Sequence, residues 1–173
     1  MSPEELESLA RTGRKRRLYV PAPAHRVELG VTHLLPHRDP FLFVDRIDAV
    51  DLAGEQIAGR RWLDPQDPLF RGHFPGDPIY PGVLQVEAMG QLGLCLYALQ
   101  RDAQEGAAAT PRAVRGLKIH HAAFLDAIRP GAELVLIAKS LESNDYTGVC
   151  AGQVLVGDTI CCFAIMEVYF VEA

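Results

Sequence analysis

The clearest pattern in the chain is an apolar run over residues 82–101, GVLQVEAMGQLGLCLYALQR. Its apolar side chains recur on nearly every face that a helix would present, which is typical of a helix buried inside a protein. Pro81 near its start and Gly106 after its end suit the two ends of a helix. Gly90 and Gly93 lower helix propensity but let a neighbouring backbone approach closely. The pattern therefore predicts one long buried helix.

Runs with strand-like composition lie on both sides of this helix. Two come before it, at roughly 41–50 and 55–63. Four follow it and are separated by the turn signals RPG, SND and GD: residues 113–125, 132–143, 146–157 and 158–171. Successive hairpins give an antiparallel sheet, and such a sheet can wrap a helix that is apolar all round. The predicted fold is α+β, with one sheet curled around a single long helix.

The 173 residues are expected to form one domain preceded by an extension. Within residues 1–26, PEELESLARTGRK predicts a short helix capped by Ser2, and YVPAPAH interrupts regular structure. We expect this extension to be partly flexible or helical, and residues 27–173 to form the domain. The basic run RTGRKRR is either a solvated helix end or a docking patch for an acidic partner.

Composition narrows the function classes. The net charge of −5 gives no reason to expect nucleic-acid binding. No run of 18 or more apolar residues predicts a membrane span, and the acidic start MSPEELESLA is unlike a secretory signal. The cysteines have no CxxC spacing and are typical of buried thiols in a reducing cytoplasm: Cys95, Cys150, Cys161 and Cys162. We expect a cytoplasmic protein without a nucleic-acid or membrane partner.

A glutamate, Glu87, interrupts the apolar helix. An isolated buried charge is costly, and burial raises the pKa of a carboxyl group toward values that suit a proton donor near neutral pH. Gln91 follows one turn later on the same face. Two interpretations remain open from the residues alone. Glu87 is either a core polar group satisfied by Gln91 or a backbone amide, or it is a general acid.

A histidine, His73, lies in the Pro/Gly-rich loop that precedes the helix, and alone it is as compatible with a surface or packing role as with catalysis. Pro75, Pro78 and Pro81 each fix φ, so the segment is stiff enough to hold a ring in one orientation. A neutral imidazole is a natural base near pH 7. The first helix amides, at Gly82, have no internal partner and can stabilise an oxyanion. Together these features predict proton chemistry beside a carbonyl group.

Two blocks carry a resemblance to a known family. LLPHRDPFLFVDRI (34–47) and GHFPGDPIYPGVLQVEAMGQ (72–91) resemble the (3R)-hydroxyacyl-[acyl-carrier-protein] dehydratases of type II fatty-acid synthesis, which have the hotdog fold. The resemblance covers about residues 31–170 and includes the spacing between His73 and Glu87. It implies a single hotdog domain in which the sheet wraps the central helix.

The resemblance also implies a role for each site residue. His73 would remove the α-proton of a 3-hydroxyacyl thioester, and Glu87 would protonate the departing β-hydroxyl to give a trans-2-enoyl product and water. The Gly82 amide would bind the thioester oxygen, and Gln91 would support the acid. Three aromatic residues complete the expected substrate-binding set: Phe74, Tyr80 and Phe124. At the position of Tyr80 this chain departs from the family, which usually has a small aliphatic residue or methionine there. No cofactor and no metal are expected, and adjacent strand residues such as His120 and His121 diverge.

The implied partners are an acyl carrier protein or coenzyme A thioester and a second copy of the chain. The family forms a homodimer in which the histidine and the acid of one site come from different subunits, and it often forms trimers of dimers. This chain reads AFLDAIRPG (123–131) where the family has a basic run associated with the carrier protein, which leaves the carrier open.

Three functions remain compatible with these residues. The first is dehydration in fatty-acid or specialised polyene or polyketide synthesis. The second is an acyl-thioester hydrolase of the same fold, which would give His73 no role. The third is a non-catalytic acyl-binding or scaffold subunit that partners an active paralogue. The product that the protein forms from a 3-hydroxyacyl thioester distinguishes these three functions.

Overall fold

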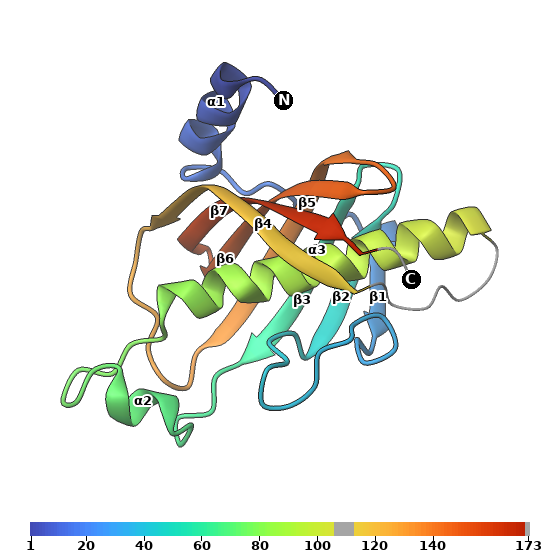
Figure 1. Ribbon diagram of the computed structural model, residues 1–173. Helices are drawn as coiled ribbons and strands as arrows, with labels where there is room; N and C mark the ends of the chain where they lie inside the picture. The colour runs from blue at the N-terminus through green and yellow to red at the C-terminus, as the bar shows by residue number, and fades with distance from the viewer. Residues whose placement is uncertain (106–112, 172–173) are drawn as a thin grey trace.

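An antiparallel sheet curls around one long helix in the computed structural model, which describes residues 1–105 and 113–171 (Figure 1). The sheet order is β1-β2-β3-β5-β6-β7-β4, and every neighbouring pair is antiparallel. The strands are β1 (Arg26–Leu29), β2 (Arg46–Asp51), β3 (Gln56–Trp62), β4 (Val114–Phe124), β5 (Glu133–Ser143), β6 (Thr147–Val156) and β7 (Thr159–Phe170). The predicted α+β class and the sheet around a central helix are confirmed.

The central helix, α3 (Gly82–Glu105), packs its buried face against the sheet. Met89, Leu92 and Leu96 are almost fully buried, and the backbone at Gly152 comes so close that a Cβ there would lie 2.6 Å from the Cβ of Met89. Small residues on the strands thus let the sheet approach the helix. By length and composition α3 could cross a membrane, but half of that stretch is buried in the protein, as in the core helix of a globular domain.

The expectation that α3 is buried on every side is wrong. Val83 is 71% exposed, and Glu87, Gly90, Gly93 and Tyr97 line an open cavity. The physical reason is that the curled sheet covers only part of the helix circumference, so one helical face stays open in the chain. Because the apolar residues cover nearly every face of the helix, the sequence pattern did not indicate which face stays open and carries the site.

The N-terminal segment packs on the outer face of the sheet, opposite α3. Helix α1 (Pro3–Gly13) begins with the predicted Ser2 cap, whose side chain accepts a hydrogen bond from the Glu5 amide. Leu6, Leu9 and Ala10 join a cluster with Phe163 and Ile165 of β7, and a short 3-10 helix, η1 (Pro23–His25), leads into β1. The helical part of the predicted extension is therefore anchored to the sheet by apolar contacts.

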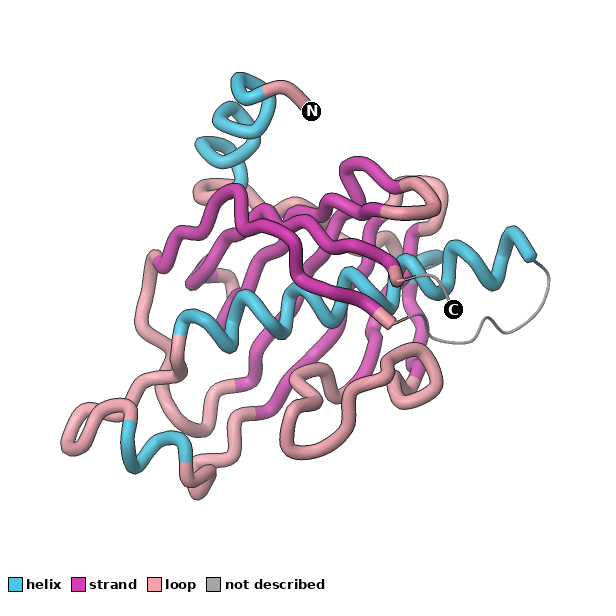
Figure 2. Tube along the Cα trace, viewed as in Figure 1, coloured by secondary structure: helices cyan, strands magenta, loops and turns pink. Residues whose placement is uncertain are grey.

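Some element boundaries differ from those predicted. Strand β2 begins at Arg46 rather than near residue 41, because the preceding segment is a loop whose backbone bonds to Gln91 on α3. Neither β1 nor the short helix α2 (Leu69–Gly72) was predicted. Helix α3 extends to Glu105, and the expected terminator Gly106 lies outside the described residues. Both long loops, residues 30–45 and 63–81, lie along the lower side of the sheet in the view of Figure 2.

Candidate active site

The candidate acid, Glu87, lies on the second turn of α3 and is oriented by Gln91. The Gln91 amide nitrogen donates to Glu87 Oε1 at 2.9 Å and to the Phe41 carbonyl at 3.0 Å, while its oxygen accepts from the Phe43 amide at 2.8 Å. Each amide hydrogen and the oxygen therefore has a partner, which fixes the orientation of the Gln91 amide group. The loop before β2 thus fixes Gln91, and Gln91 in turn orients Glu87.

Glu87 is not buried in the chain, which corrects the expectation drawn from its apolar surroundings. Its side chain is 35% exposed because it faces the open side of α3. On that side His37 approaches, with its Nε2 3.7 Å from Glu87 Oε1. His37 was not among the expected site residues. The only signal for it in the sequence is that it belongs to the block LLPHRDPFLFVDRI (34–47), which carries the family resemblance.

The candidate base, His73, is held by its own loop just after α2. Its Nδ1 lies 3.0 Å from the Ile79 carbonyl oxygen, and the Ile79 amide donates to the His73 carbonyl at 2.9 Å. Since a carbonyl oxygen only accepts hydrogen bonds, Nδ1 carries the proton in the neutral ring and Nε2 keeps its lone pair. The Phe74 ring stacks on the imidazole at 4.1 Å between centroids. This arrangement prepares Nε2 to accept a proton.

The start of α3 brings Gly82 and Phe124 together. A Cβ at Gly82 would lie 2.5 Å from the Phe124 ring, so the absence of a side chain lets the ring of this β4 residue pack on the helix terminus. The first amides of a helix have no acceptor within the helix and carry the positive end of its dipole. The exposed ring of Phe124 therefore lies beside the amides that could bind an anionic oxygen.

Tyr80 lies away from the open surface, in the core. Its side chain is 4% exposed and packs against Phe70, and its amide donates to the Ile128 carbonyl. Burial raises the pKa of Tyr80 to about 12, and within residues 1–105 and 113–171 its hydroxyl has no hydrogen-bond partner. Within one chain, Tyr80 is therefore a core residue that anchors the end of the loop that contains His73.

The expected site residues thus form three groups. Glu87 and Gln91 meet His37, Gly82 meets Phe124, and His73 meets Phe74. In the described part of one chain, no ion pair or hydrogen bond joins His73 to Glu87. The two candidate proton-transfer groups therefore do not form a pair through direct contact within one copy.

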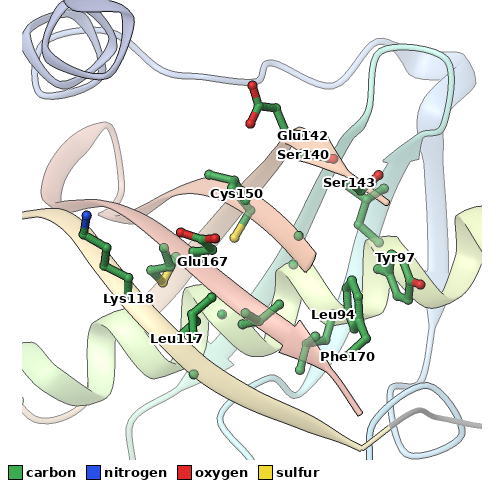
Figure 3. Close-up of a pocket in the computed structure, with 18 of the residues that line it drawn as sticks. Leu94, Tyr97, Leu117, Lys118, Ser140, Glu142, Ser143, Cys150, Glu167 and Phe170 are labelled. Carbon is green, nitrogen blue, oxygen red and sulfur yellow. The ribbon is translucent and has the colours of Figure 1, made fainter. Parts of the chain in front are cut away.

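A cavity of about 390 Å³ begins at Glu87 and extends between α3 and strands β4, β5, β6 and β7 (Figure 3). Its helix wall includes Gly90, Gly93, Leu94 and Tyr97. This volume is within the usual range for a small-molecule site. The carboxyl group of Glu87 is therefore at the border of a space that can hold a ligand.

The histidines on β4 take no part in this site. His120 Nε2 lies 2.8 Å from a Glu167 carboxylate oxygen, whereas the His121 ring contacts Phe163 on the outer face. A β-bulge between Ile119 and His121 separates the two rings. In residues 1–105 and 113–171, no group of three or more His, Cys, Asp or Glu side chains is placed to hold a metal ion.

A sheet curled around one long helix, with a carboxylate on that helix beside an open cavity, defines a hotdog-fold protein. Solved structures share this fold. A dehydratase heterocomplex, ApeI:P, from Xenorhabdus doucetiae is 15% identical with a TM-score of 0.67, over 83% of this chain and 92% of that chain. A thioesterase mutant from Pseudomonas aeruginosa is 18% identical with a TM-score of 0.53, over 74% of this chain and 81% of that one.

Sequence comparison identifies the family. Residues 35–164 match the FabA-like domain, and the chain belongs to this family. A 3-hydroxyacyl-[acyl-carrier-protein] dehydratase FabZ from a Nitratiruptor species is 32% identical over 142 residues, which are 82% of this chain and 95% of that protein. A FabZ from Caldicellulosiruptor saccharolyticus is 35% identical over 76% of this chain and 89% of its own length. The resemblance noted in the sequence is confirmed.

Proposed function

We propose that this protein dehydrates a (3R)-3-hydroxyacyl thioester to the trans-2-enoyl thioester. The observation that carries the proposal is the family membership over residues 35–164, a stretch that contains His73 and Glu87 as well as the loop with His37. Relatives at 32–35% identity are named as 3-hydroxyacyl-[acyl-carrier-protein] dehydratases. The reaction needs a base and an acid, and the free Nε2 of His73 and the oriented carboxyl group of Glu87 are candidates for these two roles.

In the proposed reaction His73 Nε2 removes the proton from the carbon beside the thioester carbonyl. The electron pair of that C–H bond forms the new C=C bond, and the bond from the β-carbon to its hydroxyl oxygen breaks. Glu87, in its protonated form, gives its proton to that oxygen, which leaves as water. The Gly82 amide stabilises the negative charge that develops on the thioester oxygen. A later proton transfer from His73 to Glu87 restores both groups.

The proposal includes a homodimer in which His73 of one protomer works with Glu87 of the other. Strand β4 is an edge of the sheet and pairs only with β7 among the described strands. Leu117 and Ile119 on this strand are 57% and 59% exposed, and Phe124 and Val83 are exposed nearby. A long apolar edge strand is a template for pairing with another chain. Assembly into trimers of dimers remains a prediction.

The proposed substrate is linked to an acyl carrier protein, with coenzyme A as the other carrier to test, and the reaction takes place in the cytoplasm. All four cysteines are free thiols, which suits a reducing compartment. Arg71 is exposed two positions before His73 in the sequence, and the exposed Lys15 and Arg16 follow α1. These side chains are the candidate contacts for an acidic carrier protein.

The reaction is tested by incubating the purified protein with 3-hydroxyacyl thioesters of both carriers. Enoyl formation is followed by absorbance or mass, and free thiol by a thiol reagent. Enoyl product supports the proposal. Thiol release without enoyl product would favour the hydrolase, and neither product would favour a non-catalytic subunit. His73→Ala and Glu87→Gln are each expected to lower kcat by at least about 100-fold.

Mixing these two inactive variants tests the shared site. In a randomly assembled mixture about half of the dimers contain one copy of each variant, and one of their two sites then has both His73 and Glu87 intact. The mixture is expected to recover about a quarter of the wild-type rate after co-refolding or co-expression. A rate that stays at the level of the separate variants would contradict a site built from two protomers.

A further inference from the structure

The candidate base is oriented by bonds within its own loop, the histidine loop (residues 73–80). His73 Nδ1 lies 3.0 Å from the Ile79 carbonyl oxygen, and the His73 carbonyl accepts from the Ile79 amide. Between these two residues the Asp77 amide donates to the Phe74 carbonyl at 3.1 Å, and the tip of the loop is exposed. These bonds fix the imidazole relative to the loop. The placement of the loop against the start of α3 therefore depends on contacts with other segments.

The loop between β4 and β5 is a fixed neighbour of the histidine loop, and we call it the support loop (residues 125–132). Its Gly131 amide donates to the Leu63 carbonyl at 2.9 Å, and the Leu63 amide donates to the Ala132 carbonyl at 3.0 Å. Ile128, in the middle of the support loop, is 1% exposed and belongs to the core. The support loop is therefore paired with the residue that follows β3 and is anchored in the core by a buried side chain.

Arg129 reaches from the support loop to the tip of the histidine loop. Its Nη1 donates to the Pro78 carbonyl at 3.3 Å and forms an ion pair with the Asp77 carboxylate. One residue earlier, the Ile128 carbonyl accepts from the Tyr80 amide at 2.8 Å, so the two loops lie side by side near the start of α3 (Figure 1). A backbone bond thus holds the end of the histidine loop, and a guanidinium group holds its tip.

We propose that Arg129 is a positioning residue, which holds the histidine loop through Asp77 and Pro78 so that His73 Nε2 can reach the substrate. This role rests on the proposed dehydratase function, in which His73 is the base. The Arg129 and Asp77 side chains are 56% and 74% exposed, and an ion pair so exposed contributes little to global stability. Its effect is expected on the chemical step instead, because a displacement of about 1 Å can slow a reaction by about 100-fold.

The test measures kcat and KM for 3-hydroxybutyryl thioesters of pantetheine and of acyl carrier protein. The pantetheine substrate has no carrier protein, so a lost contact with an acidic carrier leaves its rate unchanged. On both substrates Arg129→Gln is expected to lower kcat about 10-fold, with a change in KM of less than about 2-fold and an unchanged midpoint of urea unfolding. Asp77→Ala is expected to lower kcat by a smaller factor, about 3-fold, because the bond to Pro78 remains.

The double variant and a matched control make the comparison sharper. Arg129→Gln combined with Asp77→Ala is expected to be no slower than Arg129→Gln alone, because the two side chains act through one contact. Glu7→Gln is the control, since it removes the Arg11–Glu7 pair of α1, whose side chains are 62% and 70% exposed. Its kcat is expected to equal that of wild type.

Amide hydrogen exchange tests the contact without relying on activity. The Ile79 amide, which donates to the His73 carbonyl, is expected to exchange faster in Arg129→Gln than in wild type, while the amides in the middle of α3 keep their protection. In Glu7→Gln the exchange of the Ile79 amide is expected to match wild type. Equal exchange in Arg129→Gln and wild type would show that Arg129 does not hold the histidine loop.

The outcomes separate this role from the function on which it rests. If wild type forms no enoyl product from either substrate, the proposed dehydratase function fails, and the catalytic consequence of the Arg129 contact fails with it. If wild type is active but Arg129→Gln keeps the kcat of Glu7→Gln, the positioning role alone is overturned. It is also overturned if kcat falls together with the urea midpoint. A loss confined to the carrier-linked substrate would overturn it as well, and would make Arg129 a contact for the carrier protein.

Discussion

His37 Nε2 lies 3.7 Å from Glu87 Oε1, the same carboxylate oxygen that accepts the hydrogen bond from Gln91. The His37 ring is partly buried and lies 6.4 Å from the Phe41 ring, and its Nδ1 has no hydrogen-bond partner within residues 1–105 and 113–171. A second imidazole thus stands beside the candidate acid in the same chain. His37 is therefore placed to hold the Glu87 carboxylate in position.

His37→Asn is expected to lower kcat at least about 10-fold with a smaller change in KM, because misplacing a proton donor slows the chemical step more than binding. His33→Asn, an exposed histidine in the same loop, is the matched control. A His37 variant in which kcat stays at the wild-type value, or in which kcat and stability fall without a kcat-against-KM split, would reduce His37 to a packing residue.

Gln91→Ala is expected to lower both stability and activity. It leaves the Phe43 amide and the Phe41 carbonyl without their partner, and an unpaired buried polar group costs about 1–3 kcal/mol. It also releases Glu87 from its orientation. The measurements are urea unfolding and kcat, with Gln104→Ala, an exposed glutamine on the same helix, as control. Unchanged stability would show that the loop before β2 does not depend on this side chain.

Tyr80→Phe is expected to stabilise the protein at pH 7 by about 1 kcal/mol, because it removes a buried hydroxyl that has no partner within residues 1–105 and 113–171. KM is expected to stay at the wild-type value if Tyr80 acts only as a core residue. Unfolding by urea and enzyme kinetics measure the two effects. A raised KM would instead return Tyr80 to the substrate-binding set.

The same variant is expected to change the alkaline stability. Burial raises the pKa of Tyr80 to about 12 from 10.0. A pKa that is higher in the folded state stabilises the protein fully below the unfolded value, and this contribution is lost as pH rises toward the folded value. Wild type should therefore lose free energy of unfolding between about pH 10 and about pH 12 more steeply than Tyr80→Phe. Tyr146→Phe, an exposed tyrosine, is the control, and equal slopes would contradict the assignment.

Gln153→Ala is expected to release the N-terminal segment from the outer face of the sheet. The buried Gln153 side chain donates to the Gly13 and Arg16 carbonyls at 2.6 and 2.7 Å and accepts from the Leu18 amide at 2.8 Å. Loss of these bonds should cost about 1–3 kcal/mol and should speed amide hydrogen exchange in α1. Gln66→Ala, at an exposed position, is the control. Unchanged exchange in α1 would contradict this role.

A second variant tests the same contact through packing. A Cβ at Gly13 would lie 2.2 Å from the Phe163 ring, so Gly13→Ala cannot be accommodated without moving a fully buried aromatic side chain. It is expected to lower the free energy of unfolding by about 1–3 kcal/mol. Gly30→Ala, where nothing lies within 4 Å, is the control. Equal stability of the two variants would show that α1 shifts freely on the sheet.

Local patterns were sufficient for several features of this protein. The apolar run with Pro81 before it predicted α3, and the turn signals predicted four strands after it, because periodicity and turn chemistry depend on neighbouring residues. The boundaries of β2 were less predictable. The segment that contains Phe41 and Phe43 has the composition of a strand. The backbone groups of these two residues bond to Gln91 instead, so a contact with a helix distant in sequence decided their conformation.

By itself the sequence determined the α+β class, the long helix, the family, and His73 and Glu87 as the residues to examine. The tertiary structure alone decided that His37 meets Glu87, that Tyr97 meets Phe170, and that one face of α3 stays open. These relationships join segments that lie far apart in the chain. Their geometry follows from how the sheet curls around the helix, which no local pattern of residues specifies.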